Sequence, residues 1–194
     1  MIEILKDMKS RNITVCVAEI GVDIGATAVK IINLLKSGDK YYYFDRLPKI
    51  DELRRDFADI KSEADLIGIG NTSRYYDSYA WSLAKLCIKD KVRFDLVYLD
   101  GAHSFLHDAA ATAVLKEMMN VGGIIVFDDL DWSYASSTTA NPKMNPEIYD
   151  CYTSELIEVC QVGCVVNSIM DTDTRYRKME CSSSRRALFE RVKE

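Results

Sequence analysis

The sequence has no excess of positive charge and no long apolar run. Its 194 residues carry 25 Lys and Arg against 30 Asp and Glu, which gives a net charge of -5. An acidic chain lacks the broad phosphate-binding surface that nucleic acids require, so we expect no nucleic-acid partner. No apolar run approaches the ~18 residues of a membrane span. Residues 1–13 are charged and amphipathic, without the apolar core of a signal peptide, and we expect no membrane association.

The sequence also lacks the cysteine pairs that mark a metal ribbon or a redox motif. Six cysteines are present, but none form a C-x-x-C pair. Cys16, Cys87 and Cys164 lie within apolar runs, where cysteine behaves as a small hydrophobic residue. This usage is typical of a reducing compartment, so we expect a cytoplasmic protein without a disulfide framework.

Two nucleotide-binding glycine motifs are missing as well. Gly21 and Gly25 follow the first apolar run, but no third glycine completes G-x-G-x-x-G and no G-K-[ST] follows. A phosphate-binding P-loop is therefore excluded, and a nicotinamide oxidoreductase is a distant alternative. The two glycines still lie between a predicted strand and a predicted helix. Glycine lets a ligand approach the backbone, and a helix start offers free N–H groups, so the sequence predicts a ligand at this turn.

Strand-like and helix-like patterns alternate along the first two thirds of the chain. The strands are near-continuous apolar runs, which is typical of a parallel sheet covered on both faces. Predicted strands cover residues 13–20, 41–44, 65–69, 94–99 and 124–127. Predicted helices cover residues 27–36, 48–60, 75–88 and 104–119.

The pattern changes after the fifth strand. Composition predicts a loop over residues 131–146 and then a helix over 146–160. The runs 163–170 and 174–181 predict a hairpin. We therefore expect one domain over residues 1–194, an α/β fold with a doubly wound, mostly parallel, seven-stranded sheet that ends in an antiparallel hairpin.

One basic cluster lies near the end of the sequence. Arg185, Arg186 and Arg191 are interleaved there with Glu190 and Glu194. Opposite charges mixed in this way are typical of a solvated helix face, which is our interpretation of the cluster.

Carboxylates gather where the predicted strands end, which is where open α/β sheets bind ligands. Each one alone could be a common strand-end or helix-capping residue. Brought to one edge, however, they repel one another and need a cation, a proton or a hydroxyl-rich ligand between them. The polar residues expected at this edge are Glu19, Asp45, Asn71, Thr72, Ser73, Asp100, His103, Asp128 and Asp129.

These residues separate into two groups. Asp45 ends the second strand, where a carboxylate can accept two hydrogen bonds from a ribose diol. Asp100, Asp128 and Asp129 end the fourth and fifth strands, which we expect to be adjacent. Three oxygen ligands with room for water suit Mg²⁺, so this group predicts a metal site.

Three stretches resemble known methyltransferases. The stretch EIGVDIG over residues 19–25 resembles motif I of class I S-adenosylmethionine-dependent methyltransferases, and the predicted sheet resembles their fold. The stretches FDLVYLDGAHSF over residues 94–105 and GGIIVFDD over residues 122–129 resemble a small bacterial family allied to the sugar O-methyltransferases of antibiotic biosynthesis. The last stretch also resembles the metal-binding Asp-Asn of catechol and caffeoyl-coenzyme A O-methyltransferases, with Asp129 in the Asn position. The resemblance covers residues 13–130.

The resemblance implies a role for each group. For the cofactor, it implies that Asp45 holds the ribose of S-adenosylmethionine. It implies that Glu19 and the turn containing Gly21, Gly25 and Thr27 hold the methionine end, close to Asp100. Asn71, Thr72 and Ser73 would lie near the adenine, or would form a polar turn that caps the next helix.

The resemblance also implies how the reaction is catalysed. Asp100, Asp128 and Asp129 would bind a divalent cation that holds the substrate hydroxyls. His103 lies at the offset where the catechol enzymes have a basic lysine, and histidine can accept a proton at neutral pH. The alternative is that His103 only starts the following helix. His107 is interpreted as helix surface.

Some residues depart from the family pattern. Motif I lacks its middle glycine, and Ala111 stands where relatives often have Asp, with Asp108 one turn earlier. The segment before the first strand is short, so residues 131–150, including Trp132 and Tyr134, or a second subunit of a homodimer must supply the substrate wall. Alternatively, these two aromatics only pack the loop onto the sheet.

The expected function is an Mg²⁺-assisted, S-adenosylmethionine-dependent O-methyltransferase. It would act on a hydroxyl of a small molecule such as a sugar or a glycosylated metabolite. Two alternatives stay open: a metal-independent methyltransferase with structural Asp128 and Asp129, and a degenerate cofactor-binding scaffold without catalysis.

Overall fold

A computed structural model describes residues 1–72, 74 and 76–194. Within these residues the strands form one seven-stranded sheet in the order β3-β2-β1-β4-β5-β7-β6. The first five strands pair in parallel, and β7 is antiparallel to both β5 and β6. This confirms the predicted doubly wound sheet with an antiparallel C-terminal hairpin. The strands are β1 (Cys16–Ile20), β2 (Lys40–Arg46), β3 (Asp65–Asn71), β4 (Phe94–Leu99), β5 (Met119–Phe127), β6 (Tyr176–Lys178) and β7 (Ala187–Arg191).

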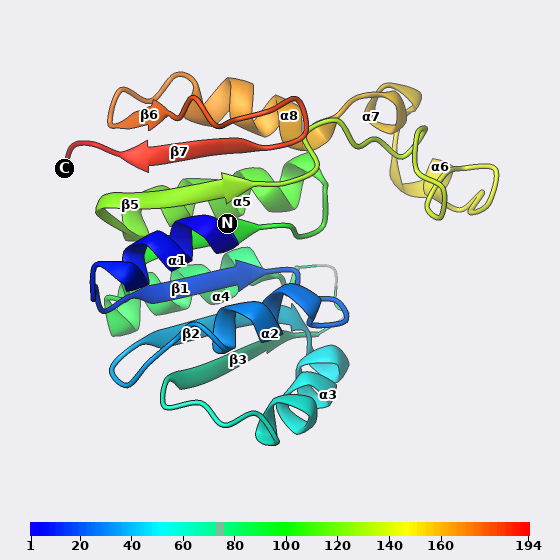
Figure 1. Ribbon diagram of the computed structural model, residues 1–194. Helices are drawn as coiled ribbons and strands as arrows, with labels where there is room; N and C mark the ends of the chain where they lie inside the picture. The colour runs from blue at the N-terminus through cyan, green and yellow to red at the C-terminus, as the bar shows by residue number, and fades with distance from the viewer. Residues whose placement is uncertain (73, 75) are drawn as a thin grey trace.

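Helices cover both faces of the sheet (Figure 1). Helices α1 (Ile2–Ser10), α2 (Ala26–Ile32) and α3 (Leu47–Ala58) pack on one face. Helices α4 (Tyr79–Lys85), α5 (Phe105–Met118) and α8 (Gln161–Val165) pack on the other. Successive strand residues point to opposite faces, so each strand contributes to two cores.

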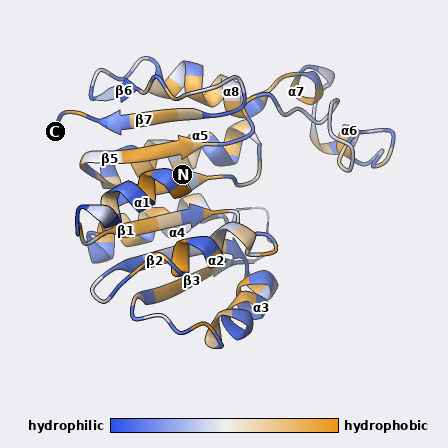
Figure 2. Ribbon diagram, viewed as in Figure 1, coloured by the Kyte–Doolittle hydropathy of each residue, from blue (hydrophilic) through white to orange (hydrophobic). Residues whose placement is uncertain are grey.

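The strand sequences show this two-sided burial directly. In β4, Leu96 belongs to the core under α1–α3 and Val97 to the core under α4, α5 and α8, and both side chains are fully buried. Figure 2 shows the hydrophobic colour along most of β5, whereas α3 is largely hydrophilic. Each strand therefore needs apolar residues at consecutive positions, which is why the parallel strands were recognisable as apolar runs.

The remaining helical segments are short. The π-helix η1 (Leu86–Asp90) extends α4, and η2 (Val166–Met170) extends α8. Helices α6 (Ile148–Cys151) and α7 (Ser154–Glu158) lie in an excursion away from the sheet (Figure 1). The single helix predicted over 146–160 is wrong, because Tyr152 and Thr153 are extended and the Thr153 side chain caps α7 by accepting from the Leu156 N–H at 3.3 Å.

Two predictions for the C-terminal region are also wrong. Residues 163–170, predicted as a strand, are helical, because Val162, Val166 and Met170 lie at helical spacing and bury one face against the sheet. The segment predicted as a solvated helix face contains β7, which lies inside the sheet between β5 and β6. Its apolar residues Ala187, Leu188 and Phe189 are buried, so the interleaved charges flank a strand.

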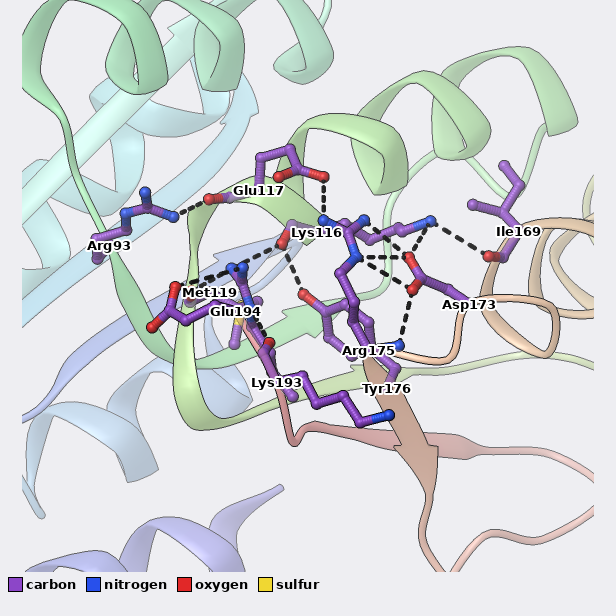
Figure 3. A network of polar contacts seen from close by, with 11 residues as sticks. Arg93, Lys116, Glu117, Met119, Ile169, Asp173, Arg175, Tyr176, Lys193 and Glu194 are labelled. Atoms are coloured by element: carbon purple, nitrogen blue, oxygen red, sulfur yellow. Dashed lines mark hydrogen bonds and ion pairs between the residues drawn. The ribbon is translucent and has the colours of Figure 1, made fainter.

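An ion network fixes the C-terminal hairpin to the end of α5 (Figure 3). Asp173 accepts hydrogen bonds from Arg175, and Lys116 approaches it at 2.7 Å. Arg175 also pairs with Glu117 at 2.8 Å. Hydrogen bonds from Arg175 and Lys116 hold the pKa of the Asp173 carboxyl well below its usual range. The network lies near the start of β5, at the sheet edge opposite the carboxyl ends of the parallel strands.

In the part of the chain that the structure describes, no helix has the length and apolar character needed to cross a membrane.

Candidate functional site

A cleft opens at the carboxyl ends of the parallel strands. Its volume is about 1040 Å³. It lies where β1 is flanked by β2 and β4, the point at which the strand order reverses and at which α/β sheets bind ligands. Gly25, Asp128 and Asp129 do not line it, and Ser73 lies outside the described residues. Of the predicted site residues, Glu19, Gly21, Thr27, Asp45, Asn71, Thr72, Asp100 and His103 line the cleft.

The glycine turn joins three strand ends. The Gly21 N–H donates to the Phe44 carbonyl of β2 at 2.9 Å. Gly21 has φ +84, and a Cβ built on it would lie 1.9 Å from the Asp100 carbonyl oxygen after β4. Only glycine therefore fits between the ends of β1 and β4. Asp23, in place of the missing middle glycine, takes φ 47, a left-handed conformation that aspartate tolerates better than most residues.

Asp45 supports this turn from the end of β2. Its Oδ2 accepts the N–H groups of Val22 and Asp23 at 2.9 and 3.0 Å. Its Oδ1 accepts the Arg46 N–H at 2.7 Å. The carboxylate therefore orders the loop, and it also lines the cleft, with acceptor capacity left on Oδ1.

Glu19 is buried beneath the same turn. Its carboxyl accepts a hydrogen bond from the Tyr41 hydroxyl and is 1% exposed. Burial raises the pKa of Glu19 to about 8, and the charges of Asp100 and Asp45 act in the same direction. The neutral carboxyl is therefore favoured at neutral pH until a positive group comes close.

Asn71 and Thr72 belong to a polar turn as well as to the cleft. The Asn71 Nδ2 donates to the Asp77 carbonyl at 3.2 Å, and the Thr72 N–H donates to an Asp77 carboxylate oxygen at 2.7 Å. Both interpretations of this segment thus describe the same residues, because the turn that leads into α4 forms a wall of the cleft.

A second cluster lies beside the end of β4. One ligand atom from each of Asp100, His103 and Asp129 lies within 4.8 Å of the others. The His103 Nε2 is 3.8 Å from oxygens of both Asp100 and Asp129. Burial, together with the charges of Asp128 and Asp129, raises the pKa of Asp100 to about 6. The arrangement favours a proton or a cation between the carboxylates.

The backbone of this cluster is held in unusual conformations. His103 and Asp129 have φ of 51 and 56, in the left-handed region that side chains other than glycine rarely adopt. Such positions persist only where the surrounding structure imposes them, and they gather at functional sites. Together with Asp23, they place three of the five positive-φ non-glycine residues among the described residues at this one sheet edge.

Asp128 has a different environment from Asp129. It is 2% exposed, and it accepts two hydrogen bonds from Arg186 at 2.9 and 2.7 Å and one from the Tyr98 hydroxyl. Burial opposes ionisation, but the hydrogen bonds from Arg186 and Tyr98 lower the pKa of Asp128 to about 2. Both of its oxygens are occupied, so the structure does not bring Asp128 into the cluster of Asp100, His103 and Asp129.

Sequence reasoning missed the two arginines at this site. β5 pairs with β7 so that Phe127 opposes Ala187. The same antiparallel register, continued one and two residues further, sets Asp128 opposite Arg186 and Asp129 opposite Arg185. The Arg185 Nη2 lies 2.7 Å from Asp129 Oδ1. An acidic pair after one strand and a basic pair before another was the available signal, but it acquires meaning only once the strand pairing is known.

Aromatic side chains form the next wall. The rings of His103 and Trp132 are 5.1 Å apart, and Trp132 packs edge-to-face on Tyr134 at 4.9 Å. Tyr134 and Tyr152 line the cleft and share a hydrogen bond of 2.9 Å between their hydroxyls. His107, interpreted from sequence as helix surface, lines the cleft and lies 2.8 Å from Ser104 Oγ.

A buried pair that sequence reasoning did not assign supports the loop after β4. The Ala102 N–H donates to the Tyr79 hydroxyl at 3.2 Å, and that hydroxyl donates to Asp108. Asp108 is 1% exposed, and burial raises its pKa to about 6. The pair fixes the loop that carries Asp100 and His103 onto α5.

Comparison with known proteins decides the family. The model of a family described as a methyltransferase domain matches residues 18–130, more than half of the chain. The chain belongs to this family. The prediction of a class I S-adenosylmethionine-dependent methyltransferase is thereby confirmed. No functionally curated protein gives a significant match.

Solved structures agree with this methyltransferase in fold. An O-methyltransferase from Bacillus cereus, in complex with SAH (S-adenosylhomocysteine), has 14% identity and a TM-score of 0.61, over 97% of this chain and 78% of that one. TomG from Streptomyces achromogenes, an O-methyltransferase involved in tomaymycin synthesis and solved with SAM, has 11% identity and a TM-score of 0.63, over 100% and 79%. MycE from the mycinamycin biosynthetic pathway, solved with Mg, SAH and mycinamycin VI, has 19% identity and a TM-score of 0.58, over 98% and 48%.

Proposed function

We propose that this methyltransferase transfers the methyl group of S-adenosylmethionine to a hydroxyl oxygen of a small molecule. The observation that carries the proposal is one cleft that holds two kinds of group. One group is the glycine turn after β1 with Asp45, and the other is Asp100 with His103. The Bacillus cereus structure with SAH and the TomG structure with SAM are O-methyltransferases, and MycE, solved with Mg and SAH, is a methyltransferase of a biosynthetic pathway, which supports this assignment.

The cofactor fits the group formed by the glycine turn and Asp45. Asp45 would accept hydrogen bonds from the ribose hydroxyls, and Gly21 leaves room for the methionine end beside the strand. Glu19 would favour the ammonium group, because a positive charge relieves the cost of ionising a buried carboxyl. Asn71 and Thr72 would lie near the adenine. Ser73 stays a prediction near the adenine, and Thr27 stays a prediction at the methionine end.

The reaction needs orientation and removal of one proton. S-adenosylmethionine supplies an electrophilic methyl carbon, which a hydroxyl oxygen attacks in line. His103 would accept the hydroxyl proton, because its ring stands between two carboxylates that stabilise the imidazolium formed. Asp100 would orient that ring. The aromatic wall of Trp132, Tyr134 and Tyr152 would exclude water and hold the substrate by stacking.

A divalent cation fits the cluster of Asp100, His103 and Asp129. Asp100 and Asp129 offer carboxylate oxygens close enough to share an ion. Burial first, and then the charges of Asp128 and Asp129, raise the pKa of Asp100, and a cation would relieve both costs of ionisation. A bound Mg²⁺ would lower the pKa of a substrate hydroxyl. Asp100 and Asp129 would hold it, and His103 would remain beside it as base. Asp128 was predicted as a third ligand; we instead propose that it anchors Arg186, because its oxygens are occupied.

The aromatic wall and the similar structures support a proposal for the substrate class. Trp132, Tyr134 and Tyr152 offer rings and hydroxyls, a combination that suits a sugar or a flat hydroxylated ring. MycE was solved with mycinamycin VI bound. We therefore propose a hydroxylated natural product, such as a glycosylated metabolite, as the acceptor.

Calorimetric titration tests the cofactor assignment. Wild-type protein should bind S-adenosylhomocysteine but not NAD. Asp45→Ala should weaken S-adenosylhomocysteine binding about tenfold or more, because a hydrogen bond to a charged group contributes roughly 1.5–3 kcal/mol. Asp51→Ala is the matched control, since Asp51 is an exposed carboxylate on α3 that pairs with Arg54. Equal loss in both variants, or no binding by the wild type, would contradict the assignment and favour a scaffold without catalysis.

A further inference from the structure

We propose that Arg185 serves as a built-in counter-ion that competes with a divalent cation for Asp129. The inference rests on the proposed function, because it concerns the cation site assigned above. Its basis is the antiparallel pairing of an acidic pair after β5 with a basic pair before β7. The cation would then bind only as the Arg185 guanidinium leaves Asp129.

The geometry places Asp129 between the Arg185 guanidinium and the His103 ring. Its Oδ1 lies 2.7 Å from the Arg185 Nη2, and its Oδ2 lies 3.8 Å from the His103 Nε2. The same guanidinium reaches Asp128 through Nε at 3.4 Å. Asp129 is the carboxylate that both the arginine and the candidate cation site use, so the two cations cannot bind it independently.

The two arginines differ in how firmly they are held. Arg186 makes two hydrogen bonds to a carboxylate whose side chain is 3% exposed, so its guanidinium is part of the folded structure. The Arg185 side chain is 60% exposed and pairs with Asp129 mainly through one nitrogen. An arginine with this exposure can change rotamer at little cost, whereas removing Arg186 would leave a buried charge without its partner.

The backbone keeps Arg185 at this position while its side chain stays free to move. The Arg185 carbonyl accepts the Leu130 N–H at 2.9 Å, which continues the pairing of β5 with β7. The pairing of β5 with β7 therefore fixes the Arg185 backbone beside Asp129. This is the arrangement expected of a replaceable counter-ion, since the Arg185 guanidinium lies near the Asp129 carboxylate but is not buried there.

The charges define the expected effect. Asp100, Asp128 and Asp129 face the guanidinium groups of Arg185 and Arg186. A divalent cation at Asp100 and Asp129 would meet repulsion from Arg185 unless that side chain swings away. Removing Arg185 abolishes both the competition and the repulsion, so cation affinity should rise about two- to fivefold.

Mn²⁺ binding measured by electron paramagnetic resonance tests the inference, because free and bound ions give different spectra. Arg185→Ala should bind Mn²⁺ about two- to fivefold more tightly than the wild type. Arg177→Ala is the matched control, because it removes one positive charge from the same hairpin at an exposed residue paired with Glu190. The control should keep the wild-type Mn²⁺ affinity.

A double variant locates the effect. In an Asp129→Asn background, Arg185→Ala should change Mn²⁺ affinity little, because the shared carboxylate is gone. Equal Mn²⁺ affinity in wild type and Arg185→Ala would overturn the inference, as would a gain that persists with Asp129→Asn. No Mn²⁺ binding in any variant would overturn it too. S-adenosylhomocysteine titration of the same samples separates these results from failure of the cofactor assignment.

Discussion

Gly21→Ala tests whether the ends of β1 and β4 must touch for the site to form. Two costs are expected. The first is conformational, because φ is +84 and an alanine in the left-handed region costs roughly 1–2 kcal/mol. The second is steric, because the new Cβ would lie 1.9 Å from the Asp100 carbonyl oxygen. That backbone would have to retreat by about 1 Å, so the loop bearing Asp100 and His103 would move with it.

Gly122→Ala separates the two costs. Gly122 has the same φ of +84, but a Cβ there would meet nothing within 4 Å. We expect Gly122→Ala to lower the free energy of unfolding by about 1 kcal/mol, the conformational cost alone. Gly21→Ala should lose ~3 kcal/mol or more, since displaced packing adds to the same penalty.

Denaturant unfolding and calorimetry measure both effects. The difference in unfolding free energy between the two variants isolates the steric cost. S-adenosylhomocysteine binding should be lost or weakened at least about tenfold in Gly21→Ala and unchanged in Gly122→Ala, because a 1 Å displacement can cost two orders of magnitude in a positioned site. Equal destabilisation of the two variants, with cofactor binding intact in both, would refute the reasoning about this contact.

Three further predictions concern ionisable side chains. Tyr79→Phe should destabilise the fold by about 1–3 kcal/mol and lower kcat without changing cofactor affinity, because it removes the hydroxyl that hydrogen-bonds both Ala102 and Asp108. Unchanged stability in urea titration together with unchanged kcat would contradict this prediction. The pKa of Glu19 is about 8 in the folded state and ~4.3 in the unfolded state, so the free energy of unfolding should fall as pH rises between these values, by up to ~1.4 kcal/mol per pH unit. Glu19→Gln should remove that slope in denaturant unfolding measured across this pH range, and an unchanged slope would contradict the role of Glu19. Asp173→Asn should lower Tm at pH above ~4, because the lowered pKa of Asp173 stabilises the fold there through the ion network of Figure 3. It should leave S-adenosylhomocysteine affinity unchanged, and weakened binding would show that the network and the cleft are coupled.

The arginines show why part of the site escaped prediction. Glu19, Asp45 and Asp100 follow recognisable apolar strands, so their common edge could be inferred from local patterns. Arg185 and Arg186 precede a short strand flanked by charges, and their partners are more than fifty residues away in the sequence. Local pattern alone does not specify which strands pair, so the cluster was interpreted as a solvated helix.

Apolar periodicity and turn residues determined the alternation of elements, the parallel sheet and the edge where the cleft lies, because each depends on neighbours within about ten residues. Tertiary structure decided the rest. It made residues 163–170 helical by burying one face against the sheet, and it inserted β7 between β5 and β6. It also assigned Asp128 to Arg186 and left Asp129 with Asp100 and His103. These outcomes depend on strand register and side-chain burial, which are set by contacts between residues far apart in the chain.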